Sequence, residues 1–381
     1  MKRTLSLILA LLLVLCMMTG CGSEEAKNES AASQEQQTQT ETASSESTTV
    51  ANVDESKEIT VAYIHSNAAI QASVSTEEAM LQAIKERNLN FRLDIQDATG
   101  DTANLSSMIE DAVSKNVDAI VIDYADLRST TSSLIVAKNA GIPVITIDAG
   151  GFVPNTVCDI TMNNYENAGK LGVYTINRIG ATGNVIIFDL DISAGVRQRC
   201  AVFEAILGEN NGIKVLEDYN VDVNKIQQDT MDAMETFIQK YGIDGIDAVY
   251  CGWDEAAYAV SLVLQQHGYT NEDCFVVGMD GHWGCTLGYM QQNENWPQVA
   301  TVVQAFDKYG ELTIDIIYKL CLMGMSPEEA MNGRTNVYVR APLVTIDTVG
   351  ELEPNVLAGY ANDYYYGDYT NPTDYTFSYQ Q

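Results

Sequence analysis

Acidic side chains stand at the ends of two similar apolar runs. The run PVITID (143–148) ends at Asp148, and the run CFVVGMD (274–280) ends at Asp280. A carboxylate accepts two or more hydrogen bonds, so a pair of them at strand ends is suited to hold adjacent hydroxyl groups. The two runs therefore predict a binding site for a hydroxyl-rich ligand such as a sugar or polyol.

Further residues of the same chemical kind follow other strand-like runs. Arg197 offers a fork of donors, Gln304 an amide, and Trp253 an aromatic face that can cover the apolar side of a sugar ring. His65 and Asp123 end two more runs. Taken singly, each acid is more often a helix N-cap, Arg197 a solvent-facing residue and Trp253 a core residue. As a set at strand ends, these residues favour ligand binding.

Signatures of catalysis are missing from the chain. It contains no GxxxxGK[ST], GxSxG or HExxH pattern, and only 3 histidines. The cysteines after Cys21 are irregularly spaced, which excludes metal-like spacing and leaves one disulfide as an open alternative. Paired carboxylates across a cleft can cleave a glycoside, so a carbohydrate-cleaving enzyme stays a distant alternative. We predict a binding protein that needs no cofactor and no metal.

Short apolar strands alternate with amphipathic helices from residue 57 onward. ITVAYIH (59–65), for example, precedes the helical stretch TEEAMLQAIKERN (76–88), and FRLDI (91–95) follows. This alternation is typical of an α/β fold in which helices cover both faces of a parallel sheet. The plan occurs twice, because VDAIVID (117–123) and IDAVYCG (246–252) each precede one of the runs that end in an acid. We therefore expect two similar lobes.

The position of the polar residues follows from this fold class. In open parallel sheets, ligands bind beyond the carboxyl ends of the strands. If the carboxyl ends of the strands in the two lobes face each other, the lobes enclose a cleft between them. Such junctions between domains are favoured ligand sites. The predicted site residues then line the cleft from both sides.

The N-terminus predicts an exported and anchored protein. Residues 1–20 combine Lys2 and Arg3 with an apolar run, which is typical of a secretory signal peptide. The tetrad Met18-Thr19-Gly20-Cys21 resembles a bacterial lipobox, so we expect a lipid on Cys21; an ordinary signal with an incidental Cys21 is the alternative. Residues 21–56 are almost free of apolar side chains and predict a disordered tether.

The charge of the chain excludes some partners. The formal net charge is −31, and loss of Lys2 and Arg3 with the signal peptide leaves 19 basic against 52 acidic residues, a net of −33. Such an excess of acids argues against binding nucleic acid or anionic lipid headgroups. The charge is compatible with the expected location, which is extracytoplasmic and lipid-anchored to the outer face of the bacterial cell membrane.

From about residue 57 to 345 the chain resembles the type I periplasmic sugar-binding proteins, the ribose/galactose-type substrate-binding components of ABC importers. The motifs that carry the resemblance run in the family's order: ITVAYIH, GIPVITID, MNNYENAGKLG, SAGVRQR, WDEAAYAV, VVGMDG and ATVVQ. The resemblance implies a monomer that delivers a small polar ligand, foremost a sugar or sugar derivative, to an ABC permease. A ligand sensor for a membrane histidine kinase or chemoreceptor is the alternative.

The resemblance also implies a domain organisation and individual roles. It implies two lobes joined by a three-crossing hinge, an N-terminal lobe of 57–161 plus 305–338 and a C-terminal lobe of 162–304 plus 339–358, followed by a Tyr-rich tail at 359–381. The implied ligand contacts are Asp148 from the first lobe, Arg197 and Asp280 from the second, and Gln304 near the hinge.

Some positions differ from the ribose-type pattern. Asp148 is followed by Ala149 rather than arginine, Val223 replaces an expected aromatic residue, and HSNAAIQAS (65–73) lacks the aromatic pair that stacks on the sugar. Trp253 stands where ribose-type members carry an asparagine. These positions predict a pocket with fewer stacking aromatics and a ligand that differs from an ordinary pentose or hexose.

Overall fold

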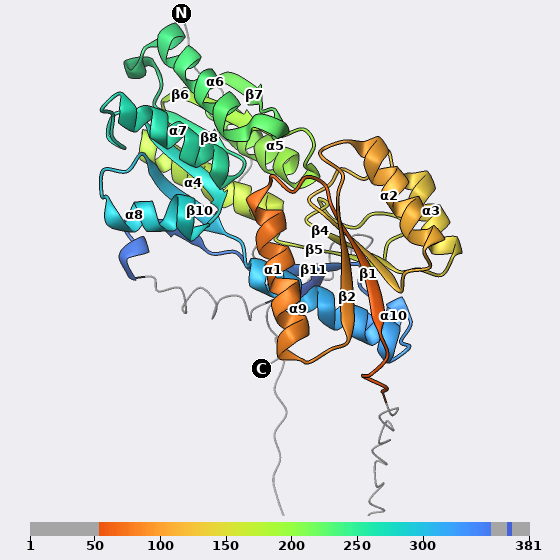
Figure 1. The fold of residues 1–381 in the computed structure, drawn as a ribbon. Coiled ribbons are helices and arrows are strands. Elements are labelled where there is room, and N and C mark those ends of the chain that lie inside the picture. The colour runs from red at the N-terminus through yellow and green to blue at the C-terminus, as the bar shows by residue number, and fades with distance from the viewer. Residues whose placement is uncertain (1–52, 352–363, 368–381) are drawn as a thin grey trace, which may run out of the picture. The chain divides into compact units, whose positions relative to one another are not determined.

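The computed structural model describes residues 53–351 and 364–367, which form two lobes, each built on one sheet (Figure 1). The first sheet has the strand order β13-β11-β5-β4-β3-β1-β2 and the second β12-β10-β9-β8-β6-β7. The strands of the first sheet are β1 (Ile59–His65), β2 (Phe91–Asp97), β3 (Ala119–Asp123), β4 (Val144–Ile147), β5 (Cys158–Thr161), β11 (Asn336–Val339) and β13 (Tyr364–Gly367). Those of the second are β6 (Gly183–Asp189), β7 (Ile213–Asn220), β8 (Ala248–Cys251), β9 (Phe275–Asp280), β10 (Gln298–Val303) and β12 (Leu343–Thr345).

Helices flank both sheets. The first lobe contains α1 (Gln71–Glu86), α2 (Thr102–Ser114), α3 (Thr131–Asn139), α9 (Phe306–Ile317) and α10 (Pro327–Ala330). The second contains α4 (Asn164–Ile179), α5 (Ala194–Gly208), α6 (Ile226–Tyr241), α7 (Asp254–Gln266) and α8 (Gly288–Gln292). Short helical turns complete the described chain: η1 (Val223–Lys225), η2 (Ile243–Gly245), η3 (Trp283–Leu287), η4 (Tyr318–Leu322) and η5 (Val349–Glu351).

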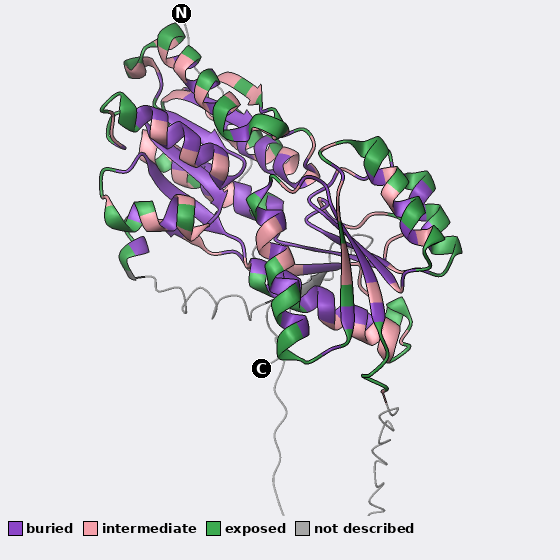
Figure 2. Ribbon diagram, viewed as in Figure 1, coloured by how far each residue is buried: buried purple, intermediate pink, exposed green. Residues whose placement is uncertain are grey.

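The central strands are buried on both faces because helices cover each side. In β1, Val61 and Tyr63 pack in the cluster that contains α1 and α9, whereas Ala62 and Ile64 pack in the cluster of α2 and α3. Successive side chains of a strand point to opposite faces, so a strand between two helix layers must be apolar throughout. Figure 2 shows this pattern, with buried central strands and exposed outer faces of the helices.

Pairing is parallel in both sheets except at one edge of each. β12 pairs antiparallel with β10, and β13 pairs antiparallel with β11. The chain changes sheets after β5, after β10 and between β11 and β12. The predicted α/β class with two similar parallel-sheet lobes is therefore confirmed.

Several predictions from the sequence fall outside the described residues. These are the signal peptide at 1–20, the lipidation of Cys21 and most of the tether at 21–56. Within the predicted tail at 359–381, only β13 is described, and it extends the first sheet. In the described ranges, the cysteines are free thiols and no helix has the length and hydropathy of a membrane span.

Candidate ligand-binding site

Asp148 lies at the carboxyl end of the first sheet, directly after β4, and is fully buried. Its φ of 47° falls in the left-handed region that few residues other than glycine adopt. Its backbone N–H donates to Ile160 O at 2.9 Å. Thr161 Oγ1 and Asn164 Nδ2 donate to its Oδ1 at 2.7 and 3.0 Å. These bonds fix the carboxylate where the chain leaves the first lobe.

Asp280 holds the corresponding place in the second sheet, as the last residue of β9. Its φ is 124°, and it too is buried. Gln304 Nε2 donates to Asp280 Oδ1 at 2.5 Å, and Tyr309 Oη donates to Gln304 Oε1 at 2.9 Å. Burial raises the Asp280 pKa to about 6, although Arg199 opposes the rise. Strained backbone at both acids is typical of functional sites.

Arg199 joins the two acids across the lobes. Its Nη2 lies 2.5 Å from Asp148 Oδ2, and its Nη1 lies 3.3 Å from Asp280 Oδ1. Nε donates to Asn164 Oδ1 at 2.7 Å, and Nη1 donates to Gly252 O at 3.0 Å. The side chain is only 2% exposed. Burial disfavours its charge, but Asp148 and Asp280 more than offset this and raise the Arg199 pKa.

The structure places Arg199, rather than Arg197, between the two acids. Arg197 is partly exposed, and its Nη2 pairs with Asp126 Oδ2 at 2.9 Å. The reason is the phase of α5, in which Val196, Arg199 and Phe203 share the buried face. This spacing of three and four residues is visible in the sequence and indicates that Arg199 shares the buried face of the helix.

The two lobes approach closely around this network. The Asp126 N–H donates to Ile192 O at 3.1 Å, and Gln198 Nε2 donates to Gly150 O at 2.6 Å. Gly195 is required by this approach, because a Cβ there would lie 2.8 Å from Asp148 Oδ1. The described conformation is therefore a closed one in which polar groups meet across the cleft.

His65 and Asp123 lie at strand ends as predicted, but they contact each other. His65 Nδ1 lies 2.8 Å from Asp123 Oδ2, and His65 Nε2 lies 2.8 Å from Glu77 Oε2. Tyr63 Oη and the Ser66 N–H also donate to Asp123. Burial lowers the His65 pKa, but the two carboxylates outweigh it and raise the pKa to about 9. The pair forms an ionic cluster of its own within the first lobe.

Trp253 is the N-cap of α7, and Asp254 is the first residue of this helix. Trp253 is 2% exposed and packs in the core of the second lobe. Asp254 is fully buried and accepts from Gln298 Nε2 at 2.7 Å, from Thr301 Oγ1 at 2.8 Å and from the Gly281 N–H at 2.7 Å. Asp254 thereby fixes the turn that follows β9. Burial, followed by repulsion from the acid of β9, raises its pKa to about 6.

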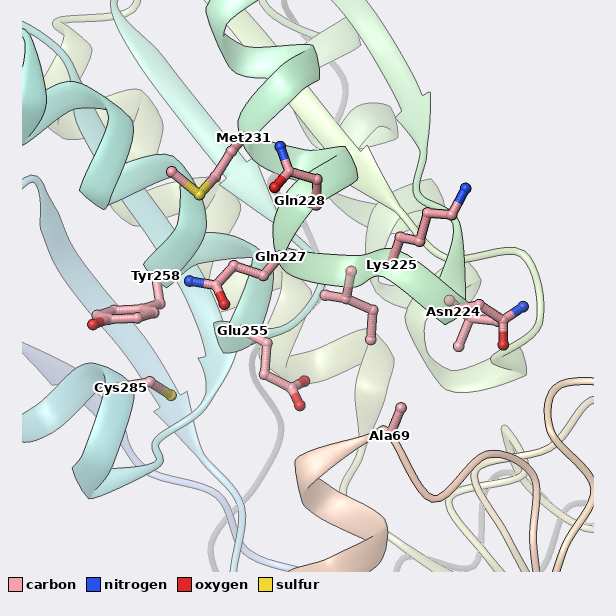
Figure 3. Close-up of a pocket in the computed structure, with 11 residues that line it drawn as sticks. Ala69, Asn224, Lys225, Gln227, Gln228, Met231, Glu255, Tyr258 and Cys285 are labelled. Atoms are coloured by element: carbon pink, nitrogen blue, oxygen red, sulfur yellow. The ribbon is translucent and has the colours of Figure 1, made fainter.

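A cavity of about 640 Å³ opens next to the start of α7 (Figure 3). Both lobes contribute to its lining: Ala69, Val223, Asn224, Lys225, Ile226, Gln227, Gln228, Met231, Glu255, Tyr258 and Cys285. Glu255 Oε1 accepts the backbone N–H of Gln71, the first residue of α1 in the other lobe, at 2.6 Å. Burial raises the Glu255 pKa to about 8. Glu255 lies within the WDEAAYAV motif but is not among the residues predicted from the sequence.

Comparison with known proteins identifies the family. The sequence model described as "Periplasmic binding protein domain" matches residues 60–324, well over half of the chain. The chain belongs to this family. The prediction of a binding protein without catalytic activity is therefore confirmed.

Named relatives and solved structures agree with this assignment. A D-apiose import binding protein of Paraburkholderia graminis is 27% identical over 224 residues, which are 57% of this chain and 67% of that protein. The ribose import binding protein of Bacillus subtilis is 23% identical over 266 residues, or 70% and 82%. An ABC transporter solute-binding protein from Agrobacterium vitis, solved with bound allitol, has a TM-score of 0.68 at 21% identity and covers 77% of this chain and 98% of its own. This structural likeness confirms the fold.

Proposed function

We propose that this protein captures a sugar or sugar derivative between its two lobes and delivers it to an ABC permease. The observation that carries the proposal is the bridge from Arg199 of the second lobe to Asp148 of the first and Asp280 of its own. These groups, with Gln304, place donors and acceptors at the carboxyl ends of both sheets. Neighbouring hydroxyl groups need this combination, because each both donates and accepts.

Closure of the lobes is the step that ligand binding controls. Asp148 and Arg199 belong to different lobes, so moving the lobes apart separates a carboxylate from its guanidinium. A ligand that contacts both lobes favours the closed form by its differential affinity for that form. The permease then distinguishes the loaded protein by its closed surface.

The N-terminal sequence supports a proposal for the location of the protein. We propose that Cys21 carries a lipid that anchors the protein to the outer face of the bacterial cell membrane, and that the following segment acts as a tether. The chain works as a monomer in this proposal. Cys21→Ala should move the protein from the membrane fraction to the soluble extracytoplasmic fraction, and its retention in the membrane would contradict the anchor.

A thermal-shift screen of the full chain tests the ligand class. Sugars and polyols should raise the unfolding temperature by mass action, whereas amino acids and nucleosides should not. Titration calorimetry with the best hit then compares Arg199→Met with Arg197→Met. We expect at least a tenfold loss of affinity for Arg199→Met, because a charge-assisted contact is lost, and about a threefold loss or less for Arg197→Met. A shift by an amino acid or nucleoside alone would refute the carbohydrate assignment.

A further inference from the structure

The cavity next to the network contains one inward-facing ionisable side chain. Its charged lining residues are Glu255 and Lys225. Lys225 is 71% exposed, its Nζ lies 3.9 Å from Asp222 Oδ2, and Figure 3 shows it pointing away from Glu255. The interior of the cavity therefore carries an acid and no inward-facing base.

One oxygen of Glu255 has no partner among the described residues. Oε1 accepts the Gln71 N–H, whereas Oε2 is buried and accepts no hydrogen bond. The Trp253 N–H is close enough to lower the Glu255 pKa, but it makes no hydrogen bond of normal geometry. A buried carboxylate oxygen without a donor is unfavourable, and each such group in a native structure calls for an explanation.

The surroundings of Glu255 contain more carboxyl groups than Arg199 can neutralise. After burial, Asp280 and Asp254 are the carboxylates that raise the Glu255 pKa. Arg199 is already engaged by Asp148, Asp280 and two neutral acceptors. Buried carboxylates ionise when a cation pairs with them, so an ammonium group in the cavity would stabilise the charged form of Glu255.

The remaining walls suit a small polar molecule. Gln227 and Gln228 bring amides that can bind hydroxyl groups, while Met231 and Tyr258 bring apolar surface. The volume of about 640 Å³ lies within the range of small-molecule sites. We propose that the ligand is an amino sugar or aminated polyol whose ammonium group binds Glu255 while its hydroxyl groups bind the amides of Gln227 and Gln228. The inference rests on the proposed function and adds a charge requirement to it.

Matched ligands separate charge from shape. Titration calorimetry on the full chain compares three members of each set: a neutral sugar, its amino-deoxy counterpart and the N-acetylated form, for example galactose, galactosamine and N-acetylgalactosamine. A polyol and its amino-deoxy form make a further set. We expect the amine to bind at least about tenfold more tightly than the neutral parent and the acetylated form, as for a buried charge-assisted contact.

Two variants test the partner of the amine. Glu255→Gln keeps an acceptor for the Gln71 N–H and removes the charge, and we expect it to abolish the preference for the amine. Glu294→Gln removes the same charge from an exposed site of the same lobe and should leave the preference intact.

Each result has a distinct meaning. Equal or tighter binding of the neutral parents by the wild type overturns the amine inference and leaves the proposed function standing. A preference for amines that survives Glu255→Gln overturns the assignment of Glu255. Absence of binding by sugars and polyols of every set refutes the proposed function and the inference together. The comparison of ligands on the wild type remains decisive even if Glu255→Gln does not fold.

Discussion

Replacing Arg199 with methionine should destabilise the protein far more than the same change two residues earlier. Arg199 is 2% exposed and pairs with Asp148 and Asp280, which are 1% and 4% exposed. Removing one partner of a buried ion pair costs about 3–5 kcal/mol. The lower end applies here, because separation of the lobes lets water reach Asp148. We therefore expect a loss of about 3 kcal/mol for Arg199→Met.

Arg197→Met provides the matched comparison. Its partner Asp126 keeps a second cation, because Arg128 Nη2 lies 2.5 Å away, and the Arg197 side chain is 23% exposed. Pairs of this kind contribute about 0.2–1 kcal/mol. Urea unfolding followed by circular dichroism measures the difference in stability between the two variants. For an m-value of about 2–3 kcal/mol/M, we expect the unfolding midpoint of Arg199→Met to lie about 1 M below that of Arg197→Met. An equal or larger loss for Arg197→Met would refute the reasoning.

The pH dependence of the stability lost in Arg199→Met provides a second test of the pairing between Arg199 and Asp280. The folded pKa of Asp280 is about 6, above its value of about 3.9 in an unfolded chain. The folded state then binds more protons between these values, so stability falls as pH rises through 6. Without Arg199 the Asp280 pKa rises further, and the destabilisation should be larger at pH 7.5 than at pH 5. A loss that does not change between these pH values would contradict the pairing.

Two further predictions concern the first lobe. The folded pKa of His65 is about 9, above its ordinary value near 6.5. The stabilisation from its charge is therefore fully present below pH 6.5 and is lost as pH rises through 9. Between pH 6.5 and 9, the urea midpoint of the wild type should fall more than that of His65→Gln. A Cβ at Gly310 would lie 2.5 Å from Ala79 Cβ and 2.6 Å from Met80 N, where α9 meets α1, so Gly310→Ala should cost about 2 kcal/mol or more in urea unfolding. Gly208→Ala, which meets no atom within 4 Å, is the control and should not destabilise the fold; equal losses for both glycines would contradict the packing argument.

The fold and the two acids could be predicted from local sequence alone. Runs such as PVITID are mostly apolar up to the final acid and lie between helices, which indicates a sheet covered on both faces. The chain must leave such a strand at its carboxyl end, and the acid there reaches the edge of the sheet. Asp148 directly follows a central strand of its lobe, and Asp280 is the last residue of one.

The partners of those acids depended on the tertiary structure. Arg199 is 51 residues from Asp148 and 81 from Asp280 in sequence. Periodicity in α5 places Arg199 on the face of Val196 and Phe203, yet a long side chain on such a face can also extend to water. The burial of Arg199 follows from two carboxylates that different sheets bring to the same place.

The role of each remaining polar residue was decided in the same way. A strand end predicts that His65 and Asp123 lie at the edge of the sheet, but β1 and β3 are neighbours, so the two side chains satisfy each other. Glu255 is the second residue of α7, and no pattern in the sequence distinguishes it from other helical acids. Only the tertiary structure places it beside a cavity and next to the first residue of α1. Sequence determines where the strands end, because burial is a local pattern. Which charges meet is decided by the packing of the lobes, because it joins residues far apart in the chain.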